Sequence, residues 1–187
     1  MGAISLEIYM PLIRSKIKNI FVTGGIHSGK TTVLNRVISG LPHLKVGGFR
    51  TIPIIEHGVK KGFVFESLTG DSMAFAHVSL DTDRQFDIYR YDLNVFDDLG
   101  VKSLTSALSD CDLILMDEIG MMERDSIDFR QMILNCLNSS IPVLGSFQQR
   151  ATWFADLLRI RNDTTVFEVT TSNRETLPEQ IISLLSI

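Results

Sequence analysis

Residues 24–31 read Gly24-Gly25-Ile26-His27-Ser28-Gly29-Lys30-Thr31. It is a full match to the pattern G-x-x-x-x-G-K-[S/T], whose glycines allow a tight turn that points successive backbone N–H groups at phosphate oxygens. The pattern is informative only between a strand and a helix. Residues 20–23 predict that strand, and an apolar stripe that starts near residue 30 and stops at Gly40 predicts the helix. We therefore interpret the segment as a phosphate-binding loop (P-loop) for a nucleoside triphosphate.

Each residue type in this loop suits a particular contact with the nucleotide. Lys30 can reach the β- and γ-phosphates and is predicted to act in catalysis as well as in binding, while the Thr31 hydroxyl can ligate Mg²⁺. The helix N-terminus adds the positive end of its dipole. His27 occupies a variable position, and we expect it to face solvent. The nucleotide-binding residues predicted from this segment are Gly24, Gly25, Ile26, His27, Ser28, Gly29, Lys30, Thr31 and Thr32.

The second candidate for phosphate chemistry is the acidic pair Asp117-Glu118, which follows the continuous apolar run at residues 113–116. Such a run is typical of a parallel strand buried on both faces. A P-loop site needs an acid at the end of a second strand to hold Mg²⁺, directly or through water, and Asp117 fits that need. Glu118 would lie at the strand exit, where it can orient and deprotonate an attacking water. We thus predict Thr31 and Asp117 as metal ligands and Glu118 as the catalytic base.

The acidic pair continues as Asp117-Glu118-Ile119-Gly120, which also spells the D-x-x-G element of signalling GTPases. That class normally reads guanine through an N-K-x-D element, and the sequence contains none. A regulatory GTPase is therefore not expected, although GTP can still be a substrate. Ile119 and Gly120 belong, with Asp117 and Glu118, to the predicted nucleotide-binding residues.

The rest of the chain alternates between strand patterns and helix patterns. A turn at His57-Gly58 and a capping-box pattern of Thr176 with Glu179 mark two of the boundaries. Strands are predicted at 46–55, 62–68, 85–93, 142–147 and 165–169, and helices at 96–108, 129–137 and 153–158. This order predicts a three-layer α/β fold with a mainly parallel sheet and right-handed crossovers. We expect one domain, residues 1–187, in which residues 46–94 form an antiparallel, β-rich insertion.

Composition limits the classes of protein that the chain can be. Its 187 residues are 44% hydrophobic and 21% charged, which is typical of one ordinary globular domain. The net charge of -4 argues against a general affinity for nucleic acid. No apolar run approaches the roughly 20 residues that span a bilayer, so no membrane partner is expected. Cys111 and Cys136 match no metal spacing and are predicted to be small buried hydrophobes. Residues 1–18 lack the features of a secretion signal, and the predicted location is the cytoplasm.

A known family shares these residues. The shared pattern comprises the P-loop with Thr31-Thr32, then Gly47-Gly48-Phe49 with Thr51, Gly62-Phe63, Asp117-Glu118-Ile119-Gly120 with Met122-Glu123, Phe129, and Asn173-Arg174. In this pattern, which runs from the P-loop almost to the C-terminus, the chain resembles the small P-loop nucleoside-triphosphatases of archaea, bacteria and animals. Some members are called cancer-related nucleoside-triphosphatases.

The resemblance implies an enzyme that hydrolyses nucleoside triphosphates to diphosphates with loose base preference. It also implies the RecA-like, catalytic-glutamate class of P-loop fold. Two departures from the family pattern are visible. The loop opens with Gly24-Gly25-Ile26-His27 where the family usually has residues like Gly-Pro-Pro-Gly, and residues 52–54 are Ile-Pro-Ile where the family often has an acid.

After Lys102 the sequence contains arginines but no lysine. Arginine can bind phosphate at two points and stabilise charge in a transition state. Arg174, just before the last helix, is the best candidate for a nucleotide contact, and Arg150 is the second. Two other functions stay open beside hydrolysis: a P-loop kinase for a small-molecule acceptor, and a binding switch that nucleotide controls. Glu118 directly after Asp117 favours water as the acceptor.

Overall fold

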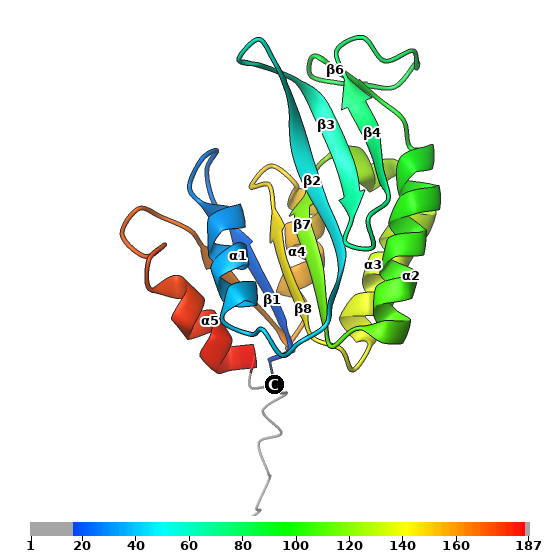
Figure 1. The fold of residues 1–187 in the computed structure, drawn as a ribbon. Helices are drawn as coiled ribbons and strands as arrows, with labels where there is room; N and C mark the ends of the chain where they lie inside the picture. Colours follow the sequence, from blue (N-terminus) through cyan, green and yellow to red (C-terminus); the bar gives the residue numbers. More distant parts are fainter. Residues whose placement is uncertain (1–16, 186–187) are drawn as a thin grey trace, which may run out of the picture.

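The computed structural model describes residues 17–185, whose strands form one nine-stranded sheet in the order β5-β6-β4-β3-β2-β7-β8-β1-β9 (Figure 1). The strands are β1 (Asn19–Thr23), β2 (Val46–Glu56), β3 (Val59–Ser67), β4 (Ser72–His77), β5 (Gln85–Phe86), β6 (Tyr89–Tyr91), β7 (Leu113–Ile119), β8 (Val143–Phe147) and β9 (Thr164–Glu168). The helices are α1 (Lys30–Ser39), α2 (Val101–Asp110), α3 (Ile127–Asn138), α4 (Thr152–Arg159) and α5 (Leu177–Leu185), with short turns η1 (Phe96–Gly100) and η2 (Met122–Asp125). The prediction about a secretion signal concerns residues 1–18. Of these, only residues 17 and 18 belong to the part that the structure describes.

The parallel part of the sheet carries the P-loop. Strand β1 pairs in parallel with β8 and β9, and β7 pairs in parallel with β2 and β8. All residues of β8 and nearly all of β7 are buried, as expected for parallel strands with helices on both faces. Strand β8 therefore separates the P-loop strand β1 from the acid-bearing strand β7, with Leu144 in register with both Ile20 and Leu115.

Two layers of helices cover this sheet. One apolar cluster joins α1 and α5 to one face through residues such as Val33, Leu34 and Ile181. The other cluster joins α2, α3 and α4 to the opposite face through residues such as Leu104 and Ile133. Figure 1 shows α1 and α5 on the side of the sheet opposite to α2 and α3. The predicted three-layer α/β P-loop fold with a mainly parallel sheet is confirmed.

Strands β2 to β6 form the antiparallel extension that residues 46–94 were expected to supply. Strands β2 and β3 make a long hairpin that turns at His57 and Gly58, both at positive φ, as predicted. The extension is tied to the main core by stacked and tilted rings: Phe49 lies 4.7 Å from Phe65 and 5.5 Å from Phe129 between ring centroids. Because Phe129 comes from α3, aromatic packing fixes the extension against the helical layer.

Two predictions in the extension are wrong. Strand β4 was not predicted, because its sequence Ser-Met-Ala-Phe-Ala-His mixes exposed and buried residues without regular alternation. Residues 85–93 were predicted as one strand but form the two short strands β5 and β6, which pair with each other. The chain reverses at Asp87, which has φ of 57°, a conformation that ends a strand and that Asp adopts more readily than most residues.

Two helix starts also differ from their patterns. The predicted helix 96–108 begins with the wider turn η1, and Gly100 there packs on a ring, since an added Cβ would lie 2.7 Å from Phe129 Cε2. Helix α5 begins at Leu177, directly after Thr176, as the capping-box pattern predicted, but the expected bond from Glu179 to the Thr176 backbone is replaced by another. The backbone N–H of Thr176, which Glu179 would have bound, donates to the carbonyl of Asn173 at 3.1 Å. A turn at residues 171–176 thus satisfies this donor before the helix begins.

Candidate active site

The P-loop lies between β1 and α1, as the sequence predicted. Gly24 and Gly29 have φ of 147° and 104°, values that favour glycine. A Cβ on Gly24 would lie 2.8 Å from the Val169 carbonyl oxygen, so the loop passes too close to the next chain segment for a side chain. Ser28 N–H donates to the carbonyl of Gly25 at 3.2 Å and closes the turn. The buried Ser28 Oγ has no hydrogen-bond partner among residues 17–185, which leaves a polar atom for a ligand.

The variable residues of the loop point away from the protein. Ile26 is 84% exposed and His27 is exposed with φ of 61°, so His27 faces solvent as expected. Their side chains do not line a cavity, and this part of the loop offers its backbone to a ligand. Thr31 and Thr32 are exposed at the start of α1. The open N-terminus of this helix therefore faces the space in front of the loop.

Lys30 lies folded over the loop and contacts the acidic strand. Its Nζ is 3.0 Å from Glu118 Oε1, and the two side chains are only 13% and 25% exposed. The ammonium also donates to the carbonyls of Gly24 at 3.2 Å and Gly25 at 3.4 Å. Lys30 and Glu118, 88 positions apart in the sequence, therefore meet at one point of the site.

Asp117 is the fifth consecutive buried residue of β7, and its side chain contacts α1. It is 4% exposed, and its Oδ1 accepts hydrogen bonds from Ser146 Oγ at 2.5 Å and from Thr31 Oγ1 at 3.5 Å. Burial raises the pKa of Asp117, and the hydrogen bonds from Ser146 and Thr31 oppose that rise, as does the charge of Arg50. The structure thus brings together Thr31 and Asp117, the two predicted metal ligands.

The donor set at this point suits Mg²⁺. A hydroxyl and a carboxylate are hard oxygen ligands, and Mg²⁺ usually takes only one or two protein ligands, with phosphates and water for the rest. Among the described residues, no three His, Cys, Asp or Glu side chains gather into a richer metal site. Thr31 and Asp117 fit a metal ion that arrives together with the nucleotide.

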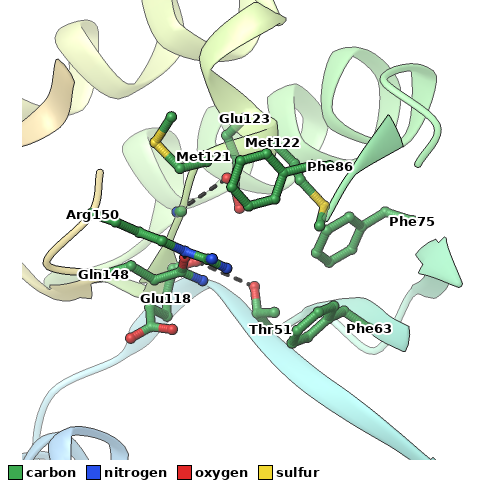
Figure 2. A pocket seen from close by; sticks show the side chains of 11 residues that line it. Thr51, Phe63, Phe75, Phe86, Glu118, Met121, Met122, Glu123, Gln148 and Arg150 are labelled. Atoms are coloured by element: carbon green, nitrogen blue, oxygen red, sulfur yellow. Dashed lines mark hydrogen bonds between the residues drawn. The ribbon is translucent and has the colours of Figure 1, made fainter. Parts of the chain in front are cut away.

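Glu118 marks the border between the P-loop and a neighbouring pocket (Figure 2). The carbonyl of Glu118 accepts a hydrogen bond from Thr51 Oγ1 at 3.3 Å, which ties the strand exit to β2. The pocket is lined by Thr51, Phe63, Phe75, Phe86, Glu118, Gly120, Met121, Met122, Glu123, Gln148 and Arg150. Most of this lining comes from the antiparallel extension and from the segments after β7 and β8. The extension therefore forms one wall beside the predicted catalytic base.

A buried carboxyl group supports the segment after β7. Glu123 is 3% exposed and its Oε2 accepts a hydrogen bond from the Gly120 N–H at 3.0 Å. Burial raises the pKa of Glu123 to about 7, against the backbone hydrogen bonds that favour its charged form. The Gly120 carbonyl in turn accepts from Trp153 Nε1 at 2.9 Å. Gly120 is thus held by its own N–H and C=O, and Ile119 beside it is buried in the apolar cluster that also contains Phe129 and Ile133 of α3.

The arginines fall at different places. Arg174 is exposed, and its Cδ lies 3.6 Å from where a Cβ on Gly29 would be, in a depression lined by Gly29, Thr32, Val33, Arg174 and Glu175. Arg150 lies at the rim of the aromatic pocket, with its guanidinium carbon 4.7 Å from the Phe86 ring centroid. Arg124, Arg159 and Arg161 form ion pairs with aspartates near them in sequence, and Arg130 lies over the Trp153 ring.

Two residues at the site were missed by sequence reasoning. Ser146 lies in the apolar strand β8, and the lone hydroxyl in a fully buried strand was the available signal. Arg50 lies on β2 in register with Asp117. Arg50 comes before Lys102, whereas the arginines considered as phosphate-binding candidates come after it. Sequence spacing does not connect Arg50 with Asp117, because their strands become neighbours only in the folded sheet.

Known proteins are similar to this chain in sequence and in fold. A family model described as NTPase matches residues 19–182. The nucleoside-triphosphatase THEP1 of Thermotoga sp. (strain RQ2) is 32% identical over 166 residues, which cover 89% of this chain and 94% of that protein. The nucleoside-triphosphatase THEP1 of Natranaerobius thermophilus is 34% identical over 171 residues, which cover 87% and 93%.

Two solved structures are similar to this one. The crystal structure of THEP1 from the hyperthermophile Aquifex aeolicus matches with a TM-score of 0.78 and 24% identity, covering 90% of this chain and 99% of that chain. The solution structure of a human cancer-related nucleoside triphosphatase matches with a TM-score of 0.73 and 28% identity, covering 89% and 96%. With the P-loop, the acidic strand and the sheet order in place, the chain belongs to the NTPase family of P-loop proteins.

Proposed function

We propose that this protein hydrolyses nucleoside triphosphates by cleaving the γ-phosphate in a Mg²⁺-dependent reaction. The observation that carries the proposal is the 3.0 Å contact between Lys30 Nζ and Glu118 Oε1. It puts a carboxylate next to the cation that binds the terminal phosphates in P-loop enzymes. Relatives of this family are named nucleoside-triphosphatases, which supports the same reaction here.

In this proposal the phosphates bind along the P-loop. Backbone N–H groups of the loop other than that of Ser28, together with the N-terminus of α1, bind the phosphate chain, and Lys30 leaves its carbonyl partners to bind the β- and γ-phosphates. Arg174, beside Gly29, is proposed as a further nucleotide contact at the outer side of the loop. Ile26 and His27 contribute their backbone, since their side chains point to solvent.

Thr31 and Asp117 are proposed to hold Mg²⁺. Their oxygens lie 3.5 Å apart, close enough for both to bind one ion after a small adjustment. When bound, Mg²⁺ neutralises charge on the β- and γ-phosphate oxygens. Ser146 keeps the Asp117 carboxylate oriented, and its hydrogen bond favours the ionised form that a metal needs.

Glu118 is proposed as the base that activates water. A water between the Glu118 carboxylate and the γ-phosphate gives its proton to Glu118, and its oxygen forms the new bond to phosphorus. The bond from that phosphorus to the β–γ bridging oxygen breaks, and the bridging oxygen leaves with the diphosphate. The products are a nucleoside diphosphate and inorganic phosphate. Lys30 stabilises the negative charge that builds on the transferred group.

Base choice is proposed to be loose. The sequence lacks a guanine-reading N-K-x-D element, and contacts to phosphate are the same for every base. We expect purine and pyrimidine triphosphates to be hydrolysed within about tenfold of one another, roughly 1.4 kcal/mol of discrimination. The test is phosphate release from a panel of nucleoside triphosphates, with Mg²⁺ or with a chelator, and with and without small-molecule acceptors. Formation of nucleoside diphosphate only when an acceptor is present, with the phosphate transferred to that acceptor, would contradict this proposal, as would a preference of several hundredfold for one base.

Three further proposals rest on the composition and on the sheet. We propose that residues 1–187 act as a single domain with residues 46–94 as an insertion. In support, β2 pairs both with β3 of the insertion and with β7 of the parallel part of the sheet. We propose the cytoplasm as the location and nucleoside triphosphate as the partner, without nucleic acid or membrane. In the part of the chain that the structure describes, no helix has the length and apolar character to cross a membrane.

A further inference from the structure

Arg50 is a positive charge placed beside the proposed metal ligands, and the mechanism above does not use it. We propose that Arg50 acts as a resident counter-charge in the metal–phosphate site: it competes with Mg²⁺ at Asp117 and adds to the attraction for the phosphates. Arg50 thereby sets how strongly nucleotide binding depends on Mg²⁺. This inference rests on the proposed function of the same site.

The sheet register places Arg50 next to Asp117. Arg50 on β2 and Asp117 on β7 are paired residues of neighbouring parallel strands, so their side chains leave the sheet on the same face. That face is the one covered by α1, because Asp117 contacts Thr31 of α1 and Arg50 contacts Asn35 of α1. The two side chains are therefore neighbours in the layer between the sheet and the P-loop helix.

The contact with α1 places the guanidinium of Arg50 one helical turn after Thr31. Arg50 Nη2 donates to Asn35 Oδ1 at 2.7 Å. Asn35 lies four positions after Thr31, and residues at this spacing share one side of a helix. The guanidinium thus lies along the same side of α1 that presents Thr31 to the proposed metal ion.

The guanidinium has more hydrogen-bonding capacity than the protein uses. An arginine carries five N–H donors, and within residues 17–185 the bond to Asn35 is the hydrogen bond that Arg50 makes. Its Nε is buried without a partner. A half-buried cation with unused N–H donors is favourable where anionic oxygens bind, and the phosphate groups of a triphosphate supply such oxygens.

Electrostatics predicts opposite effects on two affinities. A fixed positive charge near the metal position repels Mg²⁺, and it attracts a triphosphate that carries no metal. Removing the charge should therefore strengthen Mg²⁺ binding and weaken metal-free nucleotide binding. A residue that only braces α1 against β2 would instead weaken both affinities together. The two roles are distinguishable by the direction of the change.

The test uses the full-length protein and a non-hydrolysable ATP analogue with an imido group between the β- and γ-phosphates. Calorimetry gives the dissociation constant of the analogue in chelator, and a Mg²⁺ titration of the analogue complex gives the half-saturating Mg²⁺ concentration. For Arg50→Met, which keeps an unbranched side chain and loses the charge, we expect metal-free binding to weaken roughly three- to tenfold and the half-saturating Mg²⁺ concentration to fall by a similar factor. Arg50→Lys keeps the charge and should stay within about twofold of the wild type in both.

A matched variant separates charge from bracing. Asn35→Ala removes the partner of Arg50 and leaves its charge, so it should change both quantities much less than Arg50→Met does. If Asn35→Ala reproduces Arg50→Met, or if Arg50→Met weakens both affinities, the counter-charge role is wrong and Arg50 is a brace. Thermal unfolding of each variant shows whether it is folded, and Arg50→Gln replaces Arg50→Met if the latter is not. Absence of analogue binding to the wild-type protein would instead contradict the proposed function itself.

Discussion

Lys30 and Glu118 form an ion pair in which Nζ lies 3.0 Å from Oε1. The pair lies where the terminal phosphate of a nucleotide is proposed to bind. The pair links the cation of the P-loop with the proposed catalytic base while both are largely shielded from water. An incoming phosphate competes with Glu118 for Lys30. In the proposed mechanism, binding of the nucleotide breaks the pair and releases Glu118 for the attacking water.

The first prediction concerns Glu118→Gln. The amide keeps the shape of the side chain but cannot accept a proton, so hydrolysis should fall by about 10²- to 10⁴-fold, roughly 3 to 5 kcal/mol of barrier. Nucleotide binding should be retained or become tighter, because Lys30 loses the charge that competes with phosphate. Single-turnover phosphate release and calorimetry with Mg²⁺ and nucleotide measure the two effects. Glu179→Gln, on an exposed position of α5, is the control, and near wild-type turnover of Glu118→Gln would remove Glu118 from the role of base.

The second prediction concerns the two residues that open α1. Lys30→Ala should weaken triphosphate binding far more than it changes stability, since the polar partners of Lys30 within residues 17–185 are two backbone carbonyls and Glu118. Thr31→Ala should mainly weaken the part of binding that depends on Mg²⁺. Calorimetry with and without Mg²⁺ separates these outcomes, and Lys102→Ala on the surface of α2 serves as control. Unchanged triphosphate affinity in Lys30→Ala would place the phosphates elsewhere.

The third prediction concerns Ser146, whose Oγ lies 2.5 Å from Asp117 Oδ1. Ser146→Ala leaves the buried carboxylate with one donor fewer, which disfavours its ionised form and frees it to rotate. The half-saturating Mg²⁺ concentration for phosphate release should rise by about tenfold or more. The exposed Ser109→Ala, which removes a hydroxyl from α2, should leave it unchanged. Equal Mg²⁺ dependence in both variants would show that Ser146 does not support the metal ligand.

The fourth prediction concerns Glu123 and the dependence of stability on pH. Burial raises the pKa of Glu123 from 4.5 to about 7, so between these values the folded state binds more protons than the unfolded state. The contribution of Glu123 to the free energy of unfolding is therefore fully present below pH 4.5 and is lost as pH rises to about 7, by roughly 3 kcal/mol.

Glu123→Gln tests this assignment because an amide does not titrate in this range. The difference in unfolding free energy between wild type and variant should change between pH 4.5 and 7 and be constant above, with the variant gaining relative stability as pH rises. Urea unfolding followed by fluorescence of Trp153 at several pH values measures it. Parallel pH profiles of the two proteins would show that Glu123 titrates near its ordinary pKa in the folded state.

Local sequence determined the phosphate loop, the acidic strand and most of the sheet around them. A P-loop depends on residues within eight positions of one another, and glycine geometry, helix start and lysine all lie in that window. The run at residues 113–116 likewise shows a buried parallel strand by its continuous apolar character. These features follow from short-range spacing and from burial, which a sequence records directly. Ser72–His77 escaped prediction because its burial alternates irregularly and its pairing with β3 decides its structure.

Tertiary structure alone decided which distant residues share the site. Ser146 and Arg50 reach Asp117 because β8 and β2 flank β7 in the sheet, an order unrelated to distance along the chain. The contact of Lys30 with Glu118 depends on how α1 crosses the ends of these strands. Strand order and register arise from the packing of the whole core, in which β2 pairs with β7 and β1 lies between β8 and β9, strands that come much later in the chain. The phosphate-binding residues are thus close together in the sequence. The sheet order, by contrast, brings Arg50 next to Asp117.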